Sequence, residues 1–378
     1  MRITGHWLER EETQAVLACL TAGGWRALLV GGCVRNALLQ QPVADVDIAT
    51  DARPETVTEL AEKAGFHVVP TGIDHGTVTV VSGGIPHEVT TFRRDVETDG
   101  RRAVVAFSDR IAEDAVRRDF TVNALYAQAD GQVIDPLGGL PDLQARRLRF
   151  VGDAETRIRE DYLRILRFFR FHAWYGDPQE GLDPEGLAAC AALSDGLETI
   201  SRERIGAEMR KLLAAPDPAP AVAAMQQAGV LLRILPGADS RALAPLVHLE
   251  GGLPPRWQRR LAVLGGQDRG LRLRLSNPEK RQMAALEQAL SSLDSPAVLG
   301  WRMGAVGAAD AVLARAALTG APPEGWQAEV ARGAAAEFPV KAADLPALSG
   351  ATLGRRLKAL EGQWCASGLR LTRDQLLA

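Results

Sequence analysis

The chain has 378 residues, which is too long for one ordinary hydrophobic core, so we expect two to four domains. A formal net charge of −3 excludes a global basic field, and any contact with nucleic acid must come from local clusters of arginine. The four scattered cysteines lack zinc-ligand spacing and fit a reducing cytoplasm. We expect neither a secretory signal nor a membrane partner, because the N-terminus lacks an apolar h-region and no uncharged apolar run reaches spanning length.

The first part of the chain mixes helix and strand patterns. Apolar residues at helical spacing cover 8–22, and residues 27–30 form a short apolar run that predicts a buried strand. The next expected elements are a helix start at 34–39, a strand at 43–49, a helix at 54–64, and strands at 66–69, 76–82 and 87–93. Gly83 and Gly84 are a hairpin signal between the last two strands, so the sheet should be at least partly antiparallel.

The pattern changes after this hairpin. Residues 94–113 are polar and rich in arginine, and we expect a mobile loop there. A helix is expected over 114–126 and a last short strand over 133–136, and from about residue 152 only helical patterns are convincing. The chemistry-bearing motifs described below fall within these elements.

Asp45 and Asp47 stand two residues apart within an apolar strand pattern. Successive side chains of a strand alternate between its faces, so both carboxylates should point to the same side. Two hard oxygen ligands on one face are a platform for divalent metal, and Glu88 is the best candidate for a third carboxylate. The alternatives are an exposed turn for the aspartates and an edge-strand charge for Glu88.

Gly31 and Gly32 lie between the first expected strand and the helix that follows. Glycines let backbone N–H groups approach a phosphate, and the N-terminus of a helix favours anions. Taken alone the pattern is weak, because a tight strand-to-helix turn explains it equally well.

The segment RRDFTVNAL begins at Arg117. Arg117 and Arg118 could meet phosphates. Asp119 and Asn123 are four residues apart, so on one face of a helix they could hydrogen-bond a ribose. Helix capping and surface ion pairing explain the same residues and, by themselves, are the better explanation.

The segment EDYLRILR begins at Glu160 and carries an apolar stripe at helical spacing. Asp161 and Arg164 are one turn apart on another side, with Glu160 and Arg167 flanking them. A carboxylate accepts hydrogen bonds and a guanidinium donates them, so the pair could match the edge of a nucleobase. The alternative is a salt bridge worth about 0.2–0.5 kcal/mol.

A fifth motif is the N-capped helix from Ser201 to Leu213, with Arg204 on its polar side. It could support the neighbouring helices or position a nucleic-acid strand, and a solvated helix face is the default explanation.

These five motifs, in this order between about Leu28 and Leu213, resemble the class II tRNA nucleotidyltransferases, the bacterial-type CCA-adding enzymes and their poly(A) polymerase relatives.

The resemblance implies an α+β fold, with a polymerase-β-like nucleotidyltransferase head and a mixed or antiparallel sheet, followed by an all-α neck, body and tail. The head would cover 1–140, the neck 141–213, and the body and tail 214–378. The activity implied is the addition of CMP, CMP and AMP from CTP and ATP to the 3′ end of tRNA, without a nucleic-acid template and with release of pyrophosphate, in the cytoplasm.

The resemblance also assigns roles to individual residues. Asp45 and Asp47 would bind two Mg²⁺ ions, and Glu88 would complete the catalytic carboxylates. The nucleotide would be bound by Gly31, Gly32, Arg35, Arg118, Asp119, Asn123, Asp161, Arg164 and Arg167, and Glu160, Arg117 and Arg204 would support them. Asp161 and Arg164 would recognise the incoming base, so that the protein itself acts as the template.

Two features depart from the family pattern or narrow it. Asn36 stands where the family usually has Asp, which predicts adjusted contacts around the site without loss of catalysis. No His-Asp doublet occurs, so the phosphohydrolase domain of some relatives is not expected. Poly(A) polymerase and CC- or A-adding specialists remain alternatives, although the length of the loop at 94–113 argues against a CC-only enzyme. A non-catalytic RNA-binding protein is a more remote alternative.

The helical region after about Leu213 offers three arginine clusters that could contact tRNA by shape and phosphate contacts. Solvated helix faces explain them at least as well. The clusters are Arg256 with Arg259 and Arg260, Arg269 with Arg272 and Arg274, and Arg355 with Arg356. The sequence does not indicate an oligomeric state.

Overall fold

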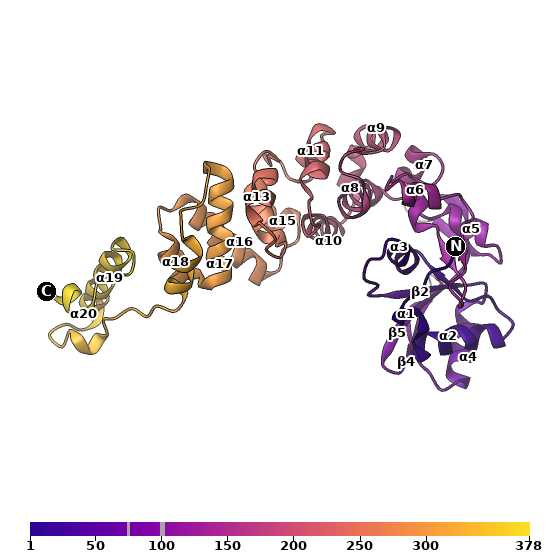
Figure 1. Ribbon diagram of the computed structural model, residues 1–378, viewed down its shortest axis with the longest axis horizontal. Helices are drawn as coiled ribbons and strands as arrows, with labels where there is room; N and C mark the ends of the chain where they lie inside the picture. Colours follow the sequence, from indigo (N-terminus) through magenta and orange to yellow (C-terminus); the bar gives the residue numbers. More distant parts are fainter. Residues whose placement is uncertain (74–75, 99–102) are drawn as a thin grey trace. The chain divides into compact units, whose positions relative to one another are not determined.

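The computed structural model describes the backbone of residues 1–73, 76–98 and 103–378, which form two compact units (Figure 1). The first unit is Met1–Ile200 and the second is Ser201–Ala378. The division into head, neck and a third region predicted from the sequence is finer than these two units, and it stays a prediction.

A mixed sheet forms the centre of the first unit. The strands are β1 Leu28–Val30, β2 Val46–Thr50, β3 His67–Gly72, β4 Thr77–Ser82, β5 Ile85–Thr91, β8 Tyr126–Ala127 and β9 Val133–Ile134. Among the described residues their order is β3-β4-β5-β2-β1-β8-β9, in which β2 and β5 are parallel and every other pair is antiparallel. The predicted fold class is therefore confirmed.

Helices cover this sheet and lead into it. They are α1 His6–Glu9, α2 Glu11–Ala22, α3 Gly32–Leu38, α4 Pro54–Lys63 and α5 Ile111–Val116. The helices α2 and α4 pack against each other and against β4 (Figure 1). The sequence explains this layer, because Val78 and Val80 of β4 are buried and Pro54 sits in the first turn of α4, where a missing N–H costs nothing.

The segment predicted as a loop at 94–113 is largely regular structure, so that prediction was wrong. Strands β6 Arg93–Thr98 and β7 Ala103–Phe107 pair antiparallel, and α5 follows them. Val104 and Val105 favour a strand by their branched side chains, and the arginines and acidic residues around them masked this preference. The tip at 99–102 lies outside the described residues, and the predicted mobility there stays a prediction.

The helix predicted over 114–126 is also wrong in most of its length. α5 ends at Val116, a 3₁₀ turn follows at Thr121–Asn123, and β8 begins at Tyr126. Phe120 has an extended backbone, with φ −127° and ψ 148°, and its buried ring lies 4.9 Å from that of Phe150, centroid to centroid. Tertiary packing of this aromatic ring therefore overrides the helical spacing.

The first unit continues with α6 Leu140–Gln144, α7 Ala154–Glu160, α8 Leu163–Tyr175, α9 Pro184–Ala192 and the 3₁₀ segment Ser194–Thr199. The second unit contains α10 Arg202–Leu213, α11 Ala219–Gln227, α12 Val230–Ile234, α13 Leu243–Glu250, α14 Trp257–Leu264, α15 Arg269–Arg272, α16 Asn277–Ser291, α17 Pro296–Thr319, α18 Trp326–Ala334, the 3₁₀ turn Ala342–Asp344, α19 Gly350–Ala366 and α20 Arg373–Leu377. Among the described residues no strand follows β9, which agrees with the helical patterns of the sequence.

One helix, α17, is long and apolar enough to cross a membrane by length and composition, with a mean hydropathy of 1.3 in its most apolar window. Just over half of that window, 56%, is buried inside the protein. Gly304 interrupts the helical backbone with φ 71°, and Asp310 on the same helix is fully buried and paired with Arg256. These are features of a helix in a protein core.

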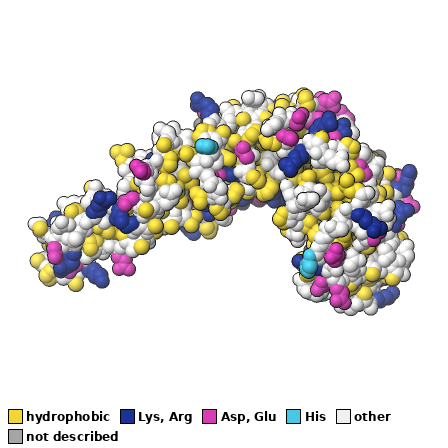
Figure 2. Space-filling view, in the orientation of Figure 1, with side chains coloured by type: hydrophobic (Ala, Val, Ile, Leu, Met, Phe, Trp, Pro, Cys, Tyr) yellow, Lys and Arg dark blue, Asp and Glu magenta, His cyan; other side chains and the backbone are white. Residues whose placement is uncertain are grey.

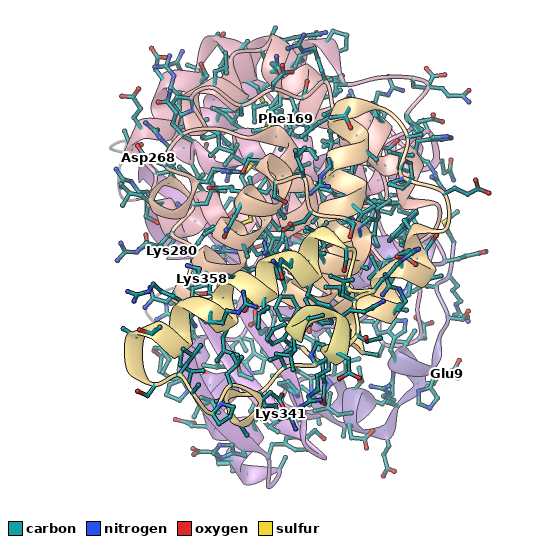
Figure 3. The ribbon with its side chains drawn as sticks, turned by 90° about the vertical axis from the view of Figure 1, so that its left-hand side faces the viewer. Glu9, Phe169, Asp268, Lys280, Lys341 and Lys358 are labelled. Atoms are coloured by element: carbon teal, nitrogen blue, oxygen red, sulfur yellow. The ribbon has the colours of Figure 1, made fainter. Side chains whose placement is uncertain are left out.

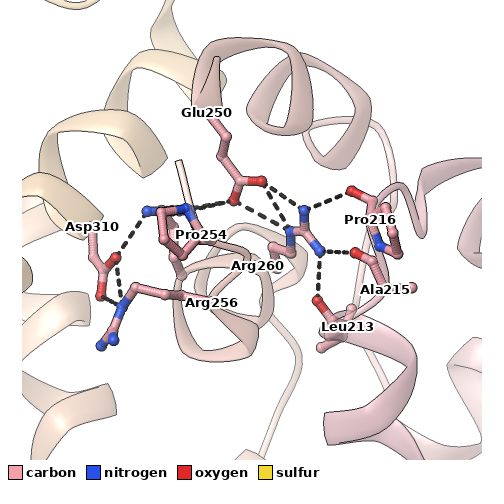
Figure 4. A network of polar contacts seen from close by, with 9 residues as sticks. Leu213, Ala215, Pro216, Glu250, Pro254, Arg256, Arg260 and Asp310 are labelled. Carbon is pink, nitrogen blue, oxygen red and sulfur yellow. Dashed lines mark hydrogen bonds and ion pairs between the residues drawn. The ribbon is translucent and has the colours of Figure 1, made fainter. Parts of the chain in front are cut away.

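A buried ionic network joins α13, α14 and α17 (Figure 4). Arg259 and Arg260 are only 2% and 1% exposed, and both donate hydrogen bonds to Glu250. Arg259 also donates to Asp310, over 3.1 Å. Arg260 further donates to the carbonyl oxygens of Leu213, Ala215 and Pro216, at and just after the end of α10. Two arginines of a cluster considered for tRNA binding, Arg259 and Arg260, are therefore buried and join helices inside the protein.

We expect Glu250→Gln to destabilise the second unit by about 3–5 kcal/mol, because it leaves two buried guanidinium groups without their shared anion. Thermal and urea unfolding followed by circular dichroism would measure the loss. Glu324→Gln, at an exposed position, is the matched control and should leave the unfolding curve unchanged. An equal curve for Glu250→Gln and the parent protein would contradict the structural role of the network.

Candidate active site

The two aspartates meet Glu88 through the register of the sheet. β2 starts at Val46, so Asp45 lies immediately before the strand and Asp47 lies within it. β2 and β5 are parallel, and Asp47 is the register partner of Glu88. Register partners on adjacent strands have their side chains on the same face. The predicted juxtaposition of Asp47 and Glu88 thus follows from the one parallel pairing of this mixed sheet among the described residues.

The charges of these residues act on one another. Burial and the negative charge of Glu88 raise the pKa of Asp47 to about 6. Asp45 adds to the rise and the positive charge of Arg118 opposes it. A divalent cation would relieve this repulsion, and carboxylate oxygens are the ligands that Mg²⁺ prefers, so the donor set fits such an ion. Among the described residues, no three His, Cys, Asp or Glu side chains are already gathered closely enough to hold a metal.

The raised pKa predicts how stability depends on pH. Without metal, the charged form of Asp47 destabilises the fold above about pH 6, and this penalty is relieved as the pH falls from 6 towards the ordinary value of 3.8. We therefore expect Asp47→Asn to be more stable than the parent protein at about pH 8 in chelator, by at most about 3 kcal/mol, and to lose this advantage near about pH 4.

Urea unfolding across this pH range would measure the difference, with exposed Glu59→Gln on α4 as the control for loss of a surface charge. Added Mg²⁺ should stabilise the parent protein more than Asp47→Asn. A parent protein that is the more stable of the two at about pH 8 in chelator would contradict the assigned environment of Asp47.

A glycine turn connects β1 to α3 beside the aspartates. Gly31 has φ 69°, a left-handed conformation that favours glycine, and its N–H donates to the carbonyl of Leu125 over 3.0 Å. A Cβ atom on Gly31 would lie 3.3 Å from Nη1 of Arg118. The turn therefore brings backbone and a guanidinium close together, as a phosphate-binding turn requires. Gly32 is the first residue of α3.

Arg118 is held by two buried partners. Its Nε donates to the hydroxyl of Tyr126 over 3.1 Å, and its Nη2 donates to Oδ2 of Asp114 over 3.0 Å. The Tyr126 hydroxyl donates to the same carboxylate oxygen over 2.7 Å. Burial lowers the pKa of Arg118, but Tyr126 and Asp114 outweigh it and the pKa is raised. The guanidinium is therefore a fixed positive charge beside the glycine turn.

Arg35 is the second arginine of the site and is only 6% exposed. Its Nη2 donates to the hydroxyl of Tyr175 over 2.8 Å, its Nη1 donates to Oδ1 of Asn123, and its guanidinium carbon lies 4.0 Å from the Tyr175 ring centroid. Asn36, the departure from the family pattern, accepts from Arg35 over 3.0 Å and donates to the carbonyl of Pro42 over 2.9 Å. An ionised aspartate could not make that donation, and the expectation that catalysis survives with asparagine stays a prediction.

Asp119 and Asn123 are in contact even though the helix that was expected to bring them together is absent. Asn123 Nδ2 donates to Asp119 Oδ1 over 2.9 Å, and Arg167 of α8 donates to Asp119 Oδ2 over 2.6 Å. Burial raises the pKa of Asp119, but the pairing with Arg167 and the bond from Asn123 outweigh it and the pKa is lowered. A continuous polar chain therefore runs from α3 through Asn123 and Asp119 to α8.

The helix predicted through EDYLRILR is broken. α7 ends at Glu160 and α8 begins at Leu163, with Asp161 extended between them at φ −155°. Arg164 Nη1 donates to Glu160 over 2.6 Å, and Arg164 Nη2 donates to the carbonyl of Arg117 over 3.2 Å. Arg164 thus pairs with Glu160, and the supporting role of Glu160 in nucleotide binding stays a prediction. Asp161 Oδ1 accepts the N–H of Leu163 over 3.1 Å. The alternative to base recognition was a salt bridge between Asp161 and Arg164. The carboxylate that Arg164 contacts is that of Glu160.

Sequence reasoning missed four residues around this site. Tyr126, Asp114 and Tyr175 bind the two arginines. The i, i+4 spacing of Asp114 and Arg118 was a signal for their ion pair, whereas no spacing indicated the two tyrosines. Arg170 was visible one helical turn after Arg167, and its charge contributes, after burial, to the lowered pKa of Arg35. Arg204 is exposed on α10 in the second unit. A surface pocket of about 650 Å³ at the end of α6 is lined by none of the candidate residues.

A mixed sheet that carries paired aspartates opposite a glutamate, beside a glycine turn and a fixed arginine, defines a nucleotidyltransferase type of head. Comparison with protein families agrees: residues 27–149 match the poly A polymerase head domain, and residues 181–241 match the probable RNA and SrmB-binding site of polymerase A.

The relatives belong to one group. A CCA-adding enzyme of Leuconostoc citreum is 43% identical over 241 residues, which are 63% of this chain and 57% of that protein. The CCA-adding enzyme of Bacillus stearothermophilus, crystallised with CTP, is 32% identical, with a TM-score of 0.75 over 94% of this chain and 93% of that one. The Thermotoga maritima CCA-adding enzyme, in complex with tRNA, shares the fold at 18% identity and a TM-score of 0.69 over 96% of this chain and 93% of that one.

The chain therefore belongs to the family of the bacterial-type CCA-adding enzymes and poly(A) polymerases, as its motifs predicted. It spans little more than half of the length of the Leuconostoc citreum relative.

Proposed function

We propose that the protein is a CCA tRNA nucleotidyltransferase, which adds CMP, CMP and AMP from CTP and ATP to the 3′ end of tRNA without a nucleic-acid template. The observation that carries the proposal is the pairing of Asp47 with Glu88, with the charge of Asp45 acting on Asp47 and with Arg118 beside the Gly31 turn. The crystallised relatives with CTP and with tRNA support the choice of substrates.

In the proposed reaction the terminal hydroxyl of the tRNA attacks the α-phosphorus of the nucleotide. A new P–O bond forms, the bond to the bridging oxygen breaks, and pyrophosphate leaves. Mg²⁺ bound to Asp45 and Asp47 would lower the pKa of the attacking hydroxyl and neutralise the leaving group. Because phosphoryl transfer needs little covalent chemistry from the protein, the chain contributes mainly position and charge.

Different residues would bind the triphosphate and the sugar of the nucleotide. The backbone of Gly31 and Gly32 and the guanidinium of Arg118 would bind the triphosphate, since both are placed at the same turn. Arg35 is already bound to protein partners and would contribute its charge from behind that turn. Asp119 and Asn123 would orient the sugar through the polar chain that they form, and Arg167 would hold that chain to α8.

Base selection would fall to Asp161 and Arg164 at the junction of α7 and α8. Arg164 is fixed by Glu160 and by the carbonyl of Arg117, which leaves little freedom for its guanidinium to adapt to a purine and a pyrimidine by itself. A carboxylate and a guanidinium present acceptors and donors to the base edge, so the protein would replace a template strand.

Contacts with tRNA would involve exposed cations of the second unit. Lys280 on α16 and Lys358 on α19 project from their helices (Figure 3), and Arg355 and Arg356 are exposed as well. On the face shown in Figure 2, positive and negative side chains are interspersed, so that phosphate contacts would be local and sensitive to salt.

Incubation with tRNA that lacks its 3′ end, with each combination of nucleotides, and sequencing of the product ends would test the function. We expect CCA ends with CTP and ATP together, and a loss of about 10²–10³-fold or more in rate for Asp47→Ala, because the metal platform is removed. Glu59→Ala is the surface control and should be as active as the parent protein. Long A tails with ATP alone would identify a poly(A) polymerase, and an unaffected Asp47→Ala would favour a non-catalytic RNA-binding role.

The β6–β7 hairpin allows a second test, of the choice between C and A. We propose that this hairpin helps the site to switch from C to A addition. Deletion of 97–108 should then leave CC addition and abolish addition of the terminal A. Sequencing of the product ends measures both steps at once, and retained CC addition is the internal control for folding. Complete CCA ends from the deletion variant would refute the role of the hairpin.

A further inference from the structure

Arg118 reaches the candidate site from a segment without regular structure. It lies after α5 and before the 3₁₀ turn at Thr121, so no helix or strand fixes its backbone. Its backbone N–H donates to the carbonyl of Ala115 over 3.1 Å, and side-chain contacts then set where the guanidinium lies. Nε and Nη2 are bound to Tyr126 and Asp114, while Nη1 is the atom nearest to the site where Gly31 would carry a Cβ.

We propose that Asp114 and Tyr126 are positioning residues for nucleotide binding, which hold Arg118 so that Nη1 stays beside the Gly31 turn. The inference rests on the proposed function, because it concerns the same triphosphate site. Neither residue would touch the nucleotide itself, since both are buried, Asp114 at 5% exposure and Tyr126 at 0%.

The three side chains form a closed ring of hydrogen bonds. The Tyr126 hydroxyl accepts from Arg118 and donates to Asp114, and Asp114 accepts from Arg118. Removal of the hydroxyl takes one acceptor from Arg118 and one donor from the buried carboxylate. A less restrained arginine must be ordered when the nucleotide binds, and that ordering lowers affinity.

The sheet fixes the distance between this ring and the glycine turn. Tyr126 lies on β8 as the register partner of Val30, and Val30 immediately precedes Gly31. Asp114 also accepts the N–H of Arg93, the first residue of β6, over 3.4 Å. The turn, the arginine and the base of the hairpin are thus attached to one buried carboxylate–tyrosine pair. If Asp114 and Tyr126 served only core stability, Tyr126 would not need to lie opposite Val30, next to the Gly31 turn.

The test compares Tyr126→Phe, which keeps the buried ring, with Asp114→Asn, Arg118→Ala and the double variant Tyr126→Phe/Arg118→Ala. Steady-state addition to tRNA gives KM and kcat for CTP, and calorimetric titration with CTP gives Kd without turnover. We expect Tyr126→Phe to raise KM and Kd by about five- to tenfold with kcat within about twofold. In the Arg118→Ala background the same change should have almost no further effect, because positioning residues act through their partner.

Glu59→Gln is the control, since Glu59 is exposed on α4 and is not one of the proposed binding residues. It should leave KM and Kd unchanged. The inference is overturned if Tyr126→Phe leaves KM and Kd unchanged, or if its effect adds fully to that of Arg118→Ala. Thermal unfolding of each variant separates a loss of affinity from a loss of folded protein, and Tyr126→Phe keeps the test decisive if Asp114→Asn fails to fold.

The same measurements distinguish an error in the proposed function from an error in the positioning role. A parent protein that binds CTP but adds nothing to tRNA would refute the nucleotidyltransferase activity, while the Kd series for Tyr126→Phe would still decide the positioning role. A parent protein that does not bind CTP would refute both.

Discussion

The polar contacts of the first unit centre on the ion pair between the buried carboxylate of Asp119 and Arg167 of α8, whose side chain is 32% exposed. A buried carboxylate without a partner is costly, so this pair forces the segment after α5 to lie against α8. Asn123 extends the contact to Arg35, and Arg35 extends it to Tyr175 at the end of the same helix. The glycine turn, the proposed sugar contacts and the proposed base-reading helix are consequently parts of one polar structure.

Two arginines beside the glycine turn are held by the same physical means. Each donates to a tyrosine hydroxyl and lies over the ring of that tyrosine, Arg118 with Tyr126 and Arg35 with Tyr175. A cation restrained in this way is ready to meet a phosphate without first being ordered, which is the general advantage of a preorganised site. The positive charge of Arg118 also moderates the repulsion that raises the pKa of Asp47.

Arginine has a second, quite different use in the other unit. Arg259 and Arg260 join α14 to Glu250 and to the carbonyl groups at the end of α10, in the protein interior. A guanidinium has five donors in a plane, so it can satisfy a carboxylate and several carbonyl groups at once. The same capacity makes arginine suitable for phosphate contacts, and a cluster in the sequence therefore does not distinguish a nucleic-acid surface from an internal clamp.

The sequence by itself determined the family and the mixed α+β head, and it named most of the candidate residues, because motifs and turn glycines are local properties of the chain. It also placed β4 and β5 within two residues, since branched residues and the Gly83–Gly84 turn act locally. It was wrong about the hairpin at β6–β7, about the helix after Val116 and about the continuous helix through Asp161. A strand partner outweighed the polar composition of the hairpin, and a buried aromatic ring outweighed the helical spacing after Val116. The helix through Asp161 breaks where the Asp161 side chain accepts the N–H of Leu163, which is a local contact. The parallel register of Asp47 with Glu88, and the contacts of Arg118 with Tyr126 and of Arg35 with Tyr175, were decided only by tertiary structure, because no spacing in the chain encodes them.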